Sequence, residues 1–179
     1  KDIDPGINSH ALTDHTQTNW NGVVGEITLE AMAPVTILDI RTFPDVDSKQ
    51  VTVKMSIRNI TGEKQECSII VQANGSGDRS AEKIPELTQN IQIDDVWTEV
   101  EIVYPMGESP LLWDEYDPNL YTISVKLKSS AGMDQKQVLF GMREFKADGT
   151  RFSINGRPLF LRGTLECCIF PETGYAAMD

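Results

Sequence analysis

Between residue 34 and about residue 140, apolar and polar residues alternate with a period of two, and no stretch repeats at the period of a helix. Val51, Val53 and Met55, for example, would share one face of an extended strand, with polar residues on the other face. Short runs rich in Gly, Asn, Asp and Ser separate these segments, as turns do. The pattern predicts strands at residues 36–43, 50–60, 65–73, 87–93, 98–103, 121–128 and 135–140.

Short strands of this number and spacing predict an all-β fold, and we interpret them as an immunoglobulin-like β-sandwich. An antibody-type domain would show two cysteines flanking a core Trp, and the three cysteines of this chain do not. Cys67 falls within an alternating strand and is expected to be a small buried side chain. The residues predicted to face the core are Val53, Met55, Ile57, Ile69, Val71, Ile123, Val125 and Leu127.

The charge of the chain limits its partners. Lys and Arg number 16 against 27 Asp and Glu, a formal net charge of −11, which argues against nucleic acid or an anionic membrane as a partner. No apolar run approaches the roughly 18 to 20 residues of a membrane span, and the N-terminus Lys1–Asp4 has no signal-peptide character. For a longer parent protein that contains this chain, a periplasmic or secreted location remains an expectation. No targeting segment in the chain supports it.

Two groups of potential metal ligands occur, and neither has the pattern of a metal site. His10, Asp14 and His15 lie in a polar loop without a fourth ligand or a helical face to arrange them. Cys167 and Cys168 are adjacent, with no His or further Cys nearby to complete a tetrahedron, and their redox state stays open. We therefore expect no metal site and no cofactor.

A β-hairpin is predicted near the C-terminus. Phe152 and Ile154 alternate with a polar residue before Asn155-Gly156, and Leu159 and Leu161 alternate after it. Asn-Gly supplies the two positive-φ positions that a type I′ turn requires. The apolar run that follows, to Phe170, would suit a buried strand of a parallel sheet.

Three motifs carry a family resemblance. They are residues 19–29, N-W-N-G-V-V-G-E-I-T-L; a Trp113–Tyr121 corner followed by F-G-M-R-E at residues 140–144; and N-G-R-P-L-F-L-R-G at residues 155–163. In this order and spacing they resemble glycoside hydrolase family 2, the β-galactosidase and β-glucuronidase group. The resemblance implies that residues 1–33 end a jelly-roll sugar-binding domain, residues 34–142 form the immunoglobulin-like sandwich, and residues 143–179 begin a truncated (β/α)8 catalytic barrel.

The family resemblance also implies a function for the parent protein. Such enzymes hydrolyse β-linked glycosides with retention, using two glutamates about 5–5.5 Å apart as acid/base and nucleophile. In the family both glutamates lie on later barrel strands, and no matching motif occurs here, so we expect no catalytic residue and no activity in this chain alone. The implied partners are the jelly-roll and barrel domains and, in the parent, a carbohydrate substrate. The truncated barrel segment could also cause self-association.

The end of the first barrel strand is where this chain would approach substrate, because barrel enzymes build their sites at the carboxyl ends of strands. Glu166 and Phe170 are the candidate substrate-binding residues there. Galactosidases of the family commonly continue R-G-x-N-x-H-E, whereas Arg162-Gly163 is followed here by Thr164-Leu165-Glu166. The alternative to a substrate-binding role is a purely structural one, in which these residues form a packed strand end with a partly exposed acid.

Two other functions compete with a family 2 fragment. An independent carbohydrate-binding module should present a flat row of exposed aromatic side chains, but Trp20, Trp97 and Trp113 lie in separate segments. An adhesion module of immunoglobulin type rests on fold analogy alone. The Asn155–Gly163 continuation favours the family 2 reading, because an adhesion module has no need of it.

Overall fold

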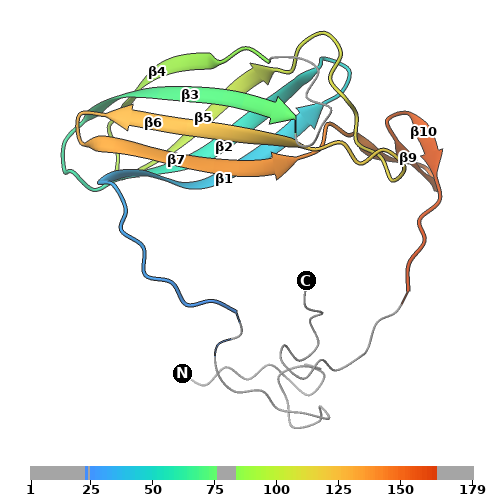
Figure 1. The fold of residues 1–179 in the computed structure, drawn as a ribbon, viewed down its shortest axis with the longest axis horizontal. Helices are drawn as coiled ribbons and strands as arrows, with labels where there is room; N and C mark the ends of the chain where they lie inside the picture. The colour runs from blue at the N-terminus through green and yellow to red at the C-terminus, as the bar shows by residue number, and fades with distance from the viewer. Residues whose placement is uncertain (1–22, 24, 76–83, 165–179) are drawn as a thin grey trace. The chain divides into compact units, whose positions relative to one another are not determined.

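The computed structural model describes residue 23 and residues 25–75 and 84–164. The chain divides into two compact units, one of residues Ala31–Leu161 and one of Lys1–Glu30 with Arg162–Asp179. All named strands belong to the first unit (Figure 1). Within the described residues, no helix is long and apolar enough to cross a membrane.

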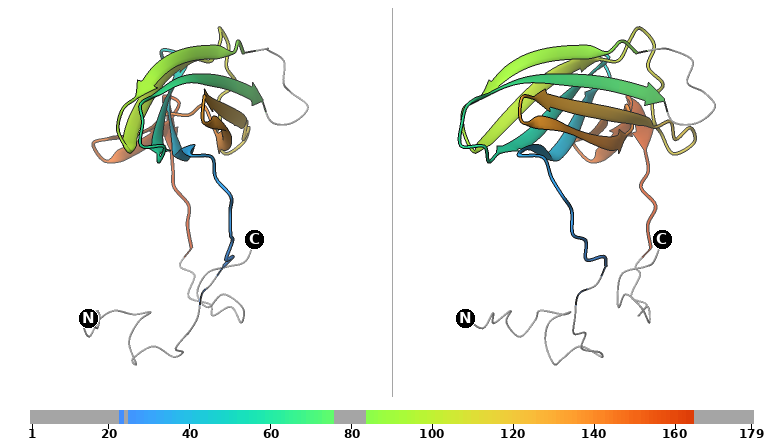
Figure 2. Two further views of the ribbon diagram at one scale, coloured as in Figure 1. Left: turned by 90° about the vertical axis from the view of Figure 1, so that its left-hand side faces the viewer. Right: turned by 60° about the vertical axis from the view of Figure 1, so that its left-hand side comes forward.

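Seven antiparallel strands form two sheets that pack face to face (Figures 1 and 2). Their bounds are β1 Val35–Asp45, β2 Gln50–Asn59, β3 Gln65–Gly75, β4 Leu87–Ile93, β5 Trp97–Pro105, β6 Tyr121–Ser129 and β7 Gly132–Phe140. The sheet orders are β1-β2-β5 and β4-β3-β6-β7. The predicted all-β sandwich is confirmed, and each predicted strand has a counterpart. The largest difference is at β7, which begins at Gly132 because Ser129 pairs with Gly132 across a tight turn.

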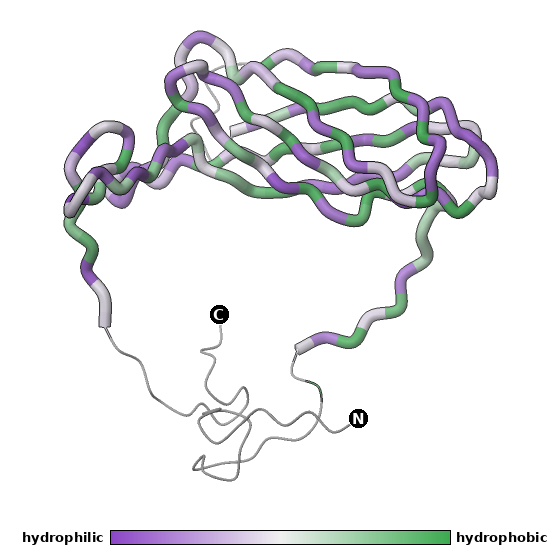
Figure 3. Tube along the Cα trace, turned by 180° about the vertical axis from the view of Figure 1, so that it is seen from behind, coloured by the Kyte–Doolittle hydropathy of each residue, from purple (hydrophilic) through white to green (hydrophobic). Residues whose placement is uncertain are grey.

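The core lies between the two sheets and follows the predicted alternation. All eight residues predicted to face inwards are at most 1% exposed, and Cys67 is buried at 3% as a free thiol. The alternation of apolar and polar residues along each strand is visible in Figure 3. Because the strand period is two, a one-residue error in register would have moved every one of these side chains to the surface.

One open side of the sandwich is closed by side chains of β7 that bind the backbone of β1. The pairing of β1 with β2 shifts between Ile37 and Asp39. At this bulge the Asp134 carboxylate accepts hydrogen bonds from the Ile37 N–H at 2.7 Å and from the Thr36 hydroxyl at 2.6 Å. The Lys136 ammonium donates to the carbonyl of Leu38 at 2.6 Å. Side chains thus satisfy main-chain groups that a bulge removes from the ladder.

A buried tyrosine ties the sheets together elsewhere in the sandwich. Tyr104 of β5 is fully buried, and its hydroxyl donates to the carbonyl of Pro85 at 2.7 Å and accepts from the Ala73 N–H at 3.1 Å. Burial raises the pKa of the Tyr104 phenol above its ordinary value. The neutral hydroxyl therefore acts as a structural link between β5, the end of β3 and the segment before β4.

A separate three-stranded sheet follows the sandwich, with strands β8 Phe145–Asp148, β9 Arg151–Ile154 and β10 Arg157–Leu159 in the order β10-β9-β8. The predicted hairpin is confirmed as β9–β10: Asn155 and Gly156 have φ values of 49° and 75°, as a type I′ turn requires. Strand β8 was not predicted. Its four residues are too few to show an alternating pattern, and only its pairing with β9 makes it a strand.

The segment before β1 differs from the prediction. The pattern of residues 19–30 predicts entry into a strand, yet no strand forms over the described residues of this segment, and Ile27 and Leu29 are exposed. Two apolar side chains at strand spacing favour a strand only where a neighbour supplies the ladder, because a lone extended segment leaves its backbone groups unpaired.

Candidate functional site

The residues predicted to bind substrate, Glu166 and Phe170, lie outside the described part of the chain. The same holds for the weighed metal ligands in the N-terminal loop and for Cys167 and Cys168. Among the described residues, no group of three or more His, Cys, Asp or Glu side chains could hold a metal ion. Several side-chain contacts between residues far apart in the sequence lie instead where the sandwich meets the small sheet. We call this region, residues 111–121 with 140–159, the junction.

Trp113 is the centre of the junction. Its N–H donates to the carbonyl of Met142 at 2.8 Å, and its ring lies beneath the Arg143 guanidinium, 4.6 Å from the ring centroid. A Cβ at Gly141 would lie 2.7 Å from the Cβ of Trp113, so only glycine fits beside it. These contacts fasten the Trp113–Tyr121 corner to the end of β7, which gives the corner a structural role.

Asn155 connects the hairpin turn to the corner. Its side-chain oxygen accepts from the Glu144 N–H at 2.9 Å, and its side-chain nitrogen donates to the carbonyl of Trp113 at 3.0 Å. Its own N–H donates to the carbonyl of Glu144 at 2.9 Å. One residue therefore supplies the left-handed turn conformation and three hydrogen bonds across the junction. The sequence predicts only the turn, because an Asn-Gly pair carries no information about which groups the Asn side chain will contact.

Arg157 makes the charged contact of the junction. Its guanidinium binds both carboxylate oxygens of Glu115 at 2.9 Å, lies 3.6 Å from a carboxylate oxygen of Asp114, and sits 5.3 Å from the Tyr116 ring centroid. The hydrogen bond to Glu115 raises the pKa of Arg157. The N–H groups of Tyr116 and Asp117 lower the pKa of Asp114. In the sequence, the signal for this contact is the pair of adjacent acids in the corner together with the basic residue after Asn-Gly.

Lys146 of β8 provides a second charged contact. It lies 2.6 Å from a carboxylate oxygen of Glu144, and that hydrogen bond raises its pKa. Asp45, the last residue of β1, and Asp47, in the turn that follows, raise the pKa of Lys146 further through their charges. The charges of Asp45 and Asp47 thus favour the Lys146 cation, while the ion pair that Lys146 makes is with Glu144.

The small sheet has one apolar face that the sandwich covers only in part. Strand register places Phe145, Phe152, Ile154 and Leu159 on the same face. Ile154 is buried at 3%, whereas Phe145 and Phe152 are exposed at 50% and 40% and stack with ring centroids 5.4 Å apart. An uncovered aromatic pair on an otherwise anchored sheet is typical of an interaction surface.

The aromatic row of a carbohydrate-binding module is not present in the described residues. Trp97 is 63% exposed at the start of β5, opposite Arg58, whereas Trp113 is held beneath Arg143 at the other end of the sandwich. Trp20 lies outside the described residues. These positions do not make one platform.

Sequence relatives of this chain include β-galactosidases. The chain is 31% identical over 162 residues to a β-galactosidase of Rhizobium meliloti, a match covering 87% of this chain and 20% of that protein. It is 46% identical over 67 residues to a β-galactosidase of Thermoanaerobacterium thermosulfurigenes, covering 36% of this chain and 9% of that protein. The chain therefore spans a quarter or less of the length of such relatives.

Solved structures share the fold. A β-galacturonidase from Eisenbergiella tayi matches with a TM-score of 0.62 and 20% identity, over 82% of this chain and 25% of that one. A β-glucuronidase from Bacteroides uniformis matches with a TM-score of 0.60 and 21% identity, over 81% and 19%. Residues 35–143 also match the family described as glycosyl hydrolases family 2. Because that match extends over more than half of the chain, from β1 to the Arg143 that covers Trp113, the chain belongs to glycosyl hydrolases family 2.

Proposed function

We propose that this chain is the non-catalytic, immunoglobulin-like part of a larger enzyme that hydrolyses O-glycosyl bonds of β-glycosides with retention. Its role is to hold the catalytic domain in place through the junction. The observation that carries this role is the small sheet itself, which is fastened to the sandwich by Asn155 and Arg157 and leaves Phe145 and Phe152 uncovered.

The uncovered face suits a catalytic domain that follows in the same chain. Stacked, half-exposed aromatic rings lose little conformational entropy on docking and bury much apolar area. One guanidinium nitrogen of Arg157 binds both carboxylate oxygens of Glu115, and this charge-assisted contact holds the sheet against the corner of the sandwich. We further propose domain limits at residues 1–33, 34–142 and 143–179, with Glu166 and Phe170 near the substrate in the parent.

The activity is proposed from the family and from relatives named β-galactosidase and β-glucuronidase. We expect the full-length protein to turn over at least one aryl β-galactoside, β-glucuronide or β-mannoside, and the 179-residue chain to turn over none. Turnover by the isolated, rigorously purified chain that falls when one of its carboxylates is replaced would overturn the proposal. So would a full-length protein inactive on every β-glycoside tested.

The docking role has its own test. Phe152→Asp should increase cleavage by protease at the junction of the full-length protein and lower its activity, because a charge cannot be buried there unpaired. Phe43→Asp is the matched control, since Phe43 is a similarly exposed phenylalanine on the outer face of β1. Equal effects of the two substitutions would contradict docking at Phe152.

In the isolated chain the uncovered face is expected to cause self-association. Size-exclusion chromatography with light scattering should show a larger mass for residues 1–179 than for a chain lacking residues 150–179. A strictly monomeric full chain would show that another part of the chain covers this face.

A further inference from the structure

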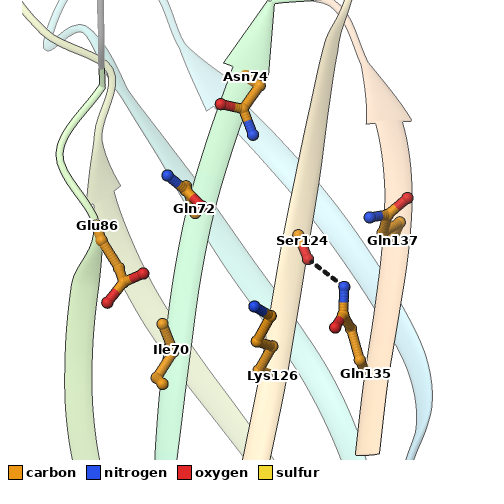
Figure 4. A pocket seen from close by; sticks show the side chains of 8 residues that line it. All are labelled: Ile70, Gln72, Asn74, Glu86, Ser124, Lys126, Gln135 and Gln137. Atoms are coloured by element: carbon orange, nitrogen blue, oxygen red, sulfur yellow. Dashed lines mark hydrogen bonds between the residues drawn. The ribbon is translucent and has the colours of Figure 1, made fainter.

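The outer face of the four-stranded sheet carries a polar hollow that is unrelated to the junction. The cavity measures about 220 Å³. Side chains of β3, β6 and β7 surround it, with Glu86 beside β3 (Figure 4). The lining residues are Ile70, Gln72, Asn74, Glu86, Ser124, Lys126, Gln135 and Gln137.

Strand register explains why a hollow forms there. Gln72 of β3, Ser124 of β6 and Gln137 of β7 lie opposite one another in one row across the sheet. Neighbouring strands are about 4.8 Å apart, so a short serine between two long amides leaves a space bounded by both. Lys126, two residues along β6, closes one end, as Figure 4 shows. We call this space the amide groove.

The polar groups of the amide groove are available to a ligand. Within the described part of the chain, Gln135 donates to the Ser124 hydroxyl at 3.0 Å, and the amides of Gln72, Asn74 and Gln137 have no protein partner. Each free amide offers donors and an acceptor together. Lys126 and Glu86 contribute one positive and one negative charge, so the groove is formally neutral on a chain of net charge −11.

These properties select a class of ligand. A peptide strand cannot add to this part of the sheet, because β3 and β6 are each paired on both sides. An apolar helix would bury the unpaired amides at a cost. A neutral carbohydrate ring instead presents hydroxyl groups that both donate and accept, as the amides do. The volume lies below the roughly 300–1,000 Å³ of ordinary ligand pockets, which fits one ring and not a chain of rings.

We propose that the amide groove is a binding site for a single neutral pyranose unit. The site rests on the proposed function, since a glycoside-hydrolysing parent meets such units on its substrates. No aromatic ring lines the groove, so the stacking that strengthens sugar binding is missing and the affinity should be millimolar. The groove would hold a non-reacting part of a glycan close to the enzyme.

Titration of the 179-residue chain with methyl β-galactoside and methyl β-glucoside, followed by backbone amide NMR, tests this proposal. We expect saturable shifts at Gln72, Ser124 and Gln137 for at least one of them, and none at Trp97 on the opposite sheet. Glucuronate should bind more weakly, because the groove has no net positive charge. Absence of saturable shifts at about 100 mM sugar, far above a millimolar dissociation constant, would overturn the proposal.

Two substitutions decide whether the groove itself binds. Ser124→Phe fills the centre of the groove and should weaken binding at least tenfold. Ser68→Phe places the same ring on the outer face of β3, two rows away, and should leave binding unchanged. Equal loss in both variants, or no loss in Ser124→Phe, would refute the assignment. In the full-length protein, Ser124→Phe should leave turnover of small aryl glycosides unchanged, so failure of the groove and failure of the glycosidase proposal are distinguishable.

Discussion

The side-chain closure between β7 and β1 offers the sharpest test of how the sandwich is stabilised. Asp134→Ala removes the carboxylate that accepts from the Ile37 N–H and the Thr36 hydroxyl. Ile37 is fully buried and Thr36 is 2% exposed, so water cannot readily replace the lost acceptor. We expect the free energy of unfolding to fall.

The size of this effect follows from the two hydrogen bonds. A hydrogen bond to a charged group contributes about 1.5–3 kcal/mol, and each buried donor left without a partner costs about 1–3 kcal/mol. In the unfolded chain the Asp134 carboxylate is hydrated, which offsets part of this gain. The free energy of unfolding should therefore fall by about 2–4 kcal/mol in total. A domain is stable by only about 5–15 kcal/mol, so such a loss is readily measured.

Urea unfolding monitored by fluorescence provides the measurement. With an m value of about 2 kcal/mol/M, the middle of the usual range, the midpoint should fall by about 1–2 M. Asp134→Asn retains an oxygen acceptor without the charge and should lose about half as much. Asp95→Ala is the control, because Asp95 is an exposed acid that makes no hydrogen bond or ion pair with the described residues. A change below about 0.5 kcal/mol for Asp134→Ala, the range of ordinary surface substitutions, would refute the reasoning.

Three further predictions concern the core, the corner and pH. Tyr104→Phe should cost about 1–3 kcal/mol in urea unfolding, because the Ala73 N–H and the Pro85 carbonyl lose their buried partner; no loss would mean that water replaces the hydroxyl. Gly141→Ala should destabilise the sandwich by about 1–3 kcal/mol, since its Cβ would overlap Trp113. An unchanged melting temperature would show that the Trp113–Tyr121 corner moves aside at no cost. Backbone N–H groups lower the pKa of Asp114, so its contribution is present above the unfolded pKa near 3.9 and is lost as pH falls through the lower folded value. Urea midpoints between pH 6 and pH 3 should therefore fall less in Asp114→Asn than in the unaltered chain, and parallel curves would count against this.

Some side-chain roles could not be predicted because their partners are remote in the sequence. Asp134 lies 98 residues from Thr36, and Asn155 lies 42 residues from Trp113. No local pattern relates residues so far apart, and the same residue types would fit an ordinary turn or an exposed strand face. The amide groove is equally remote, since it depends on which residues of β3, β6 and β7 come into register.

The sequence by itself determined the strands, their inward faces and the turn at Asn155-Gly156, because these depend on the two-residue period and on local backbone preference. The family motifs could also be read from the sequence alone, because each lies in one contiguous stretch of residues. Only the tertiary structure decided which polar side chains satisfy the backbone at the β1 bulge, how Arg157 fixes the small sheet, and which half of the apolar face stays open. Those outcomes depend on strand register and on contacts between segments far apart in the chain, and local residue preferences carry no information about either.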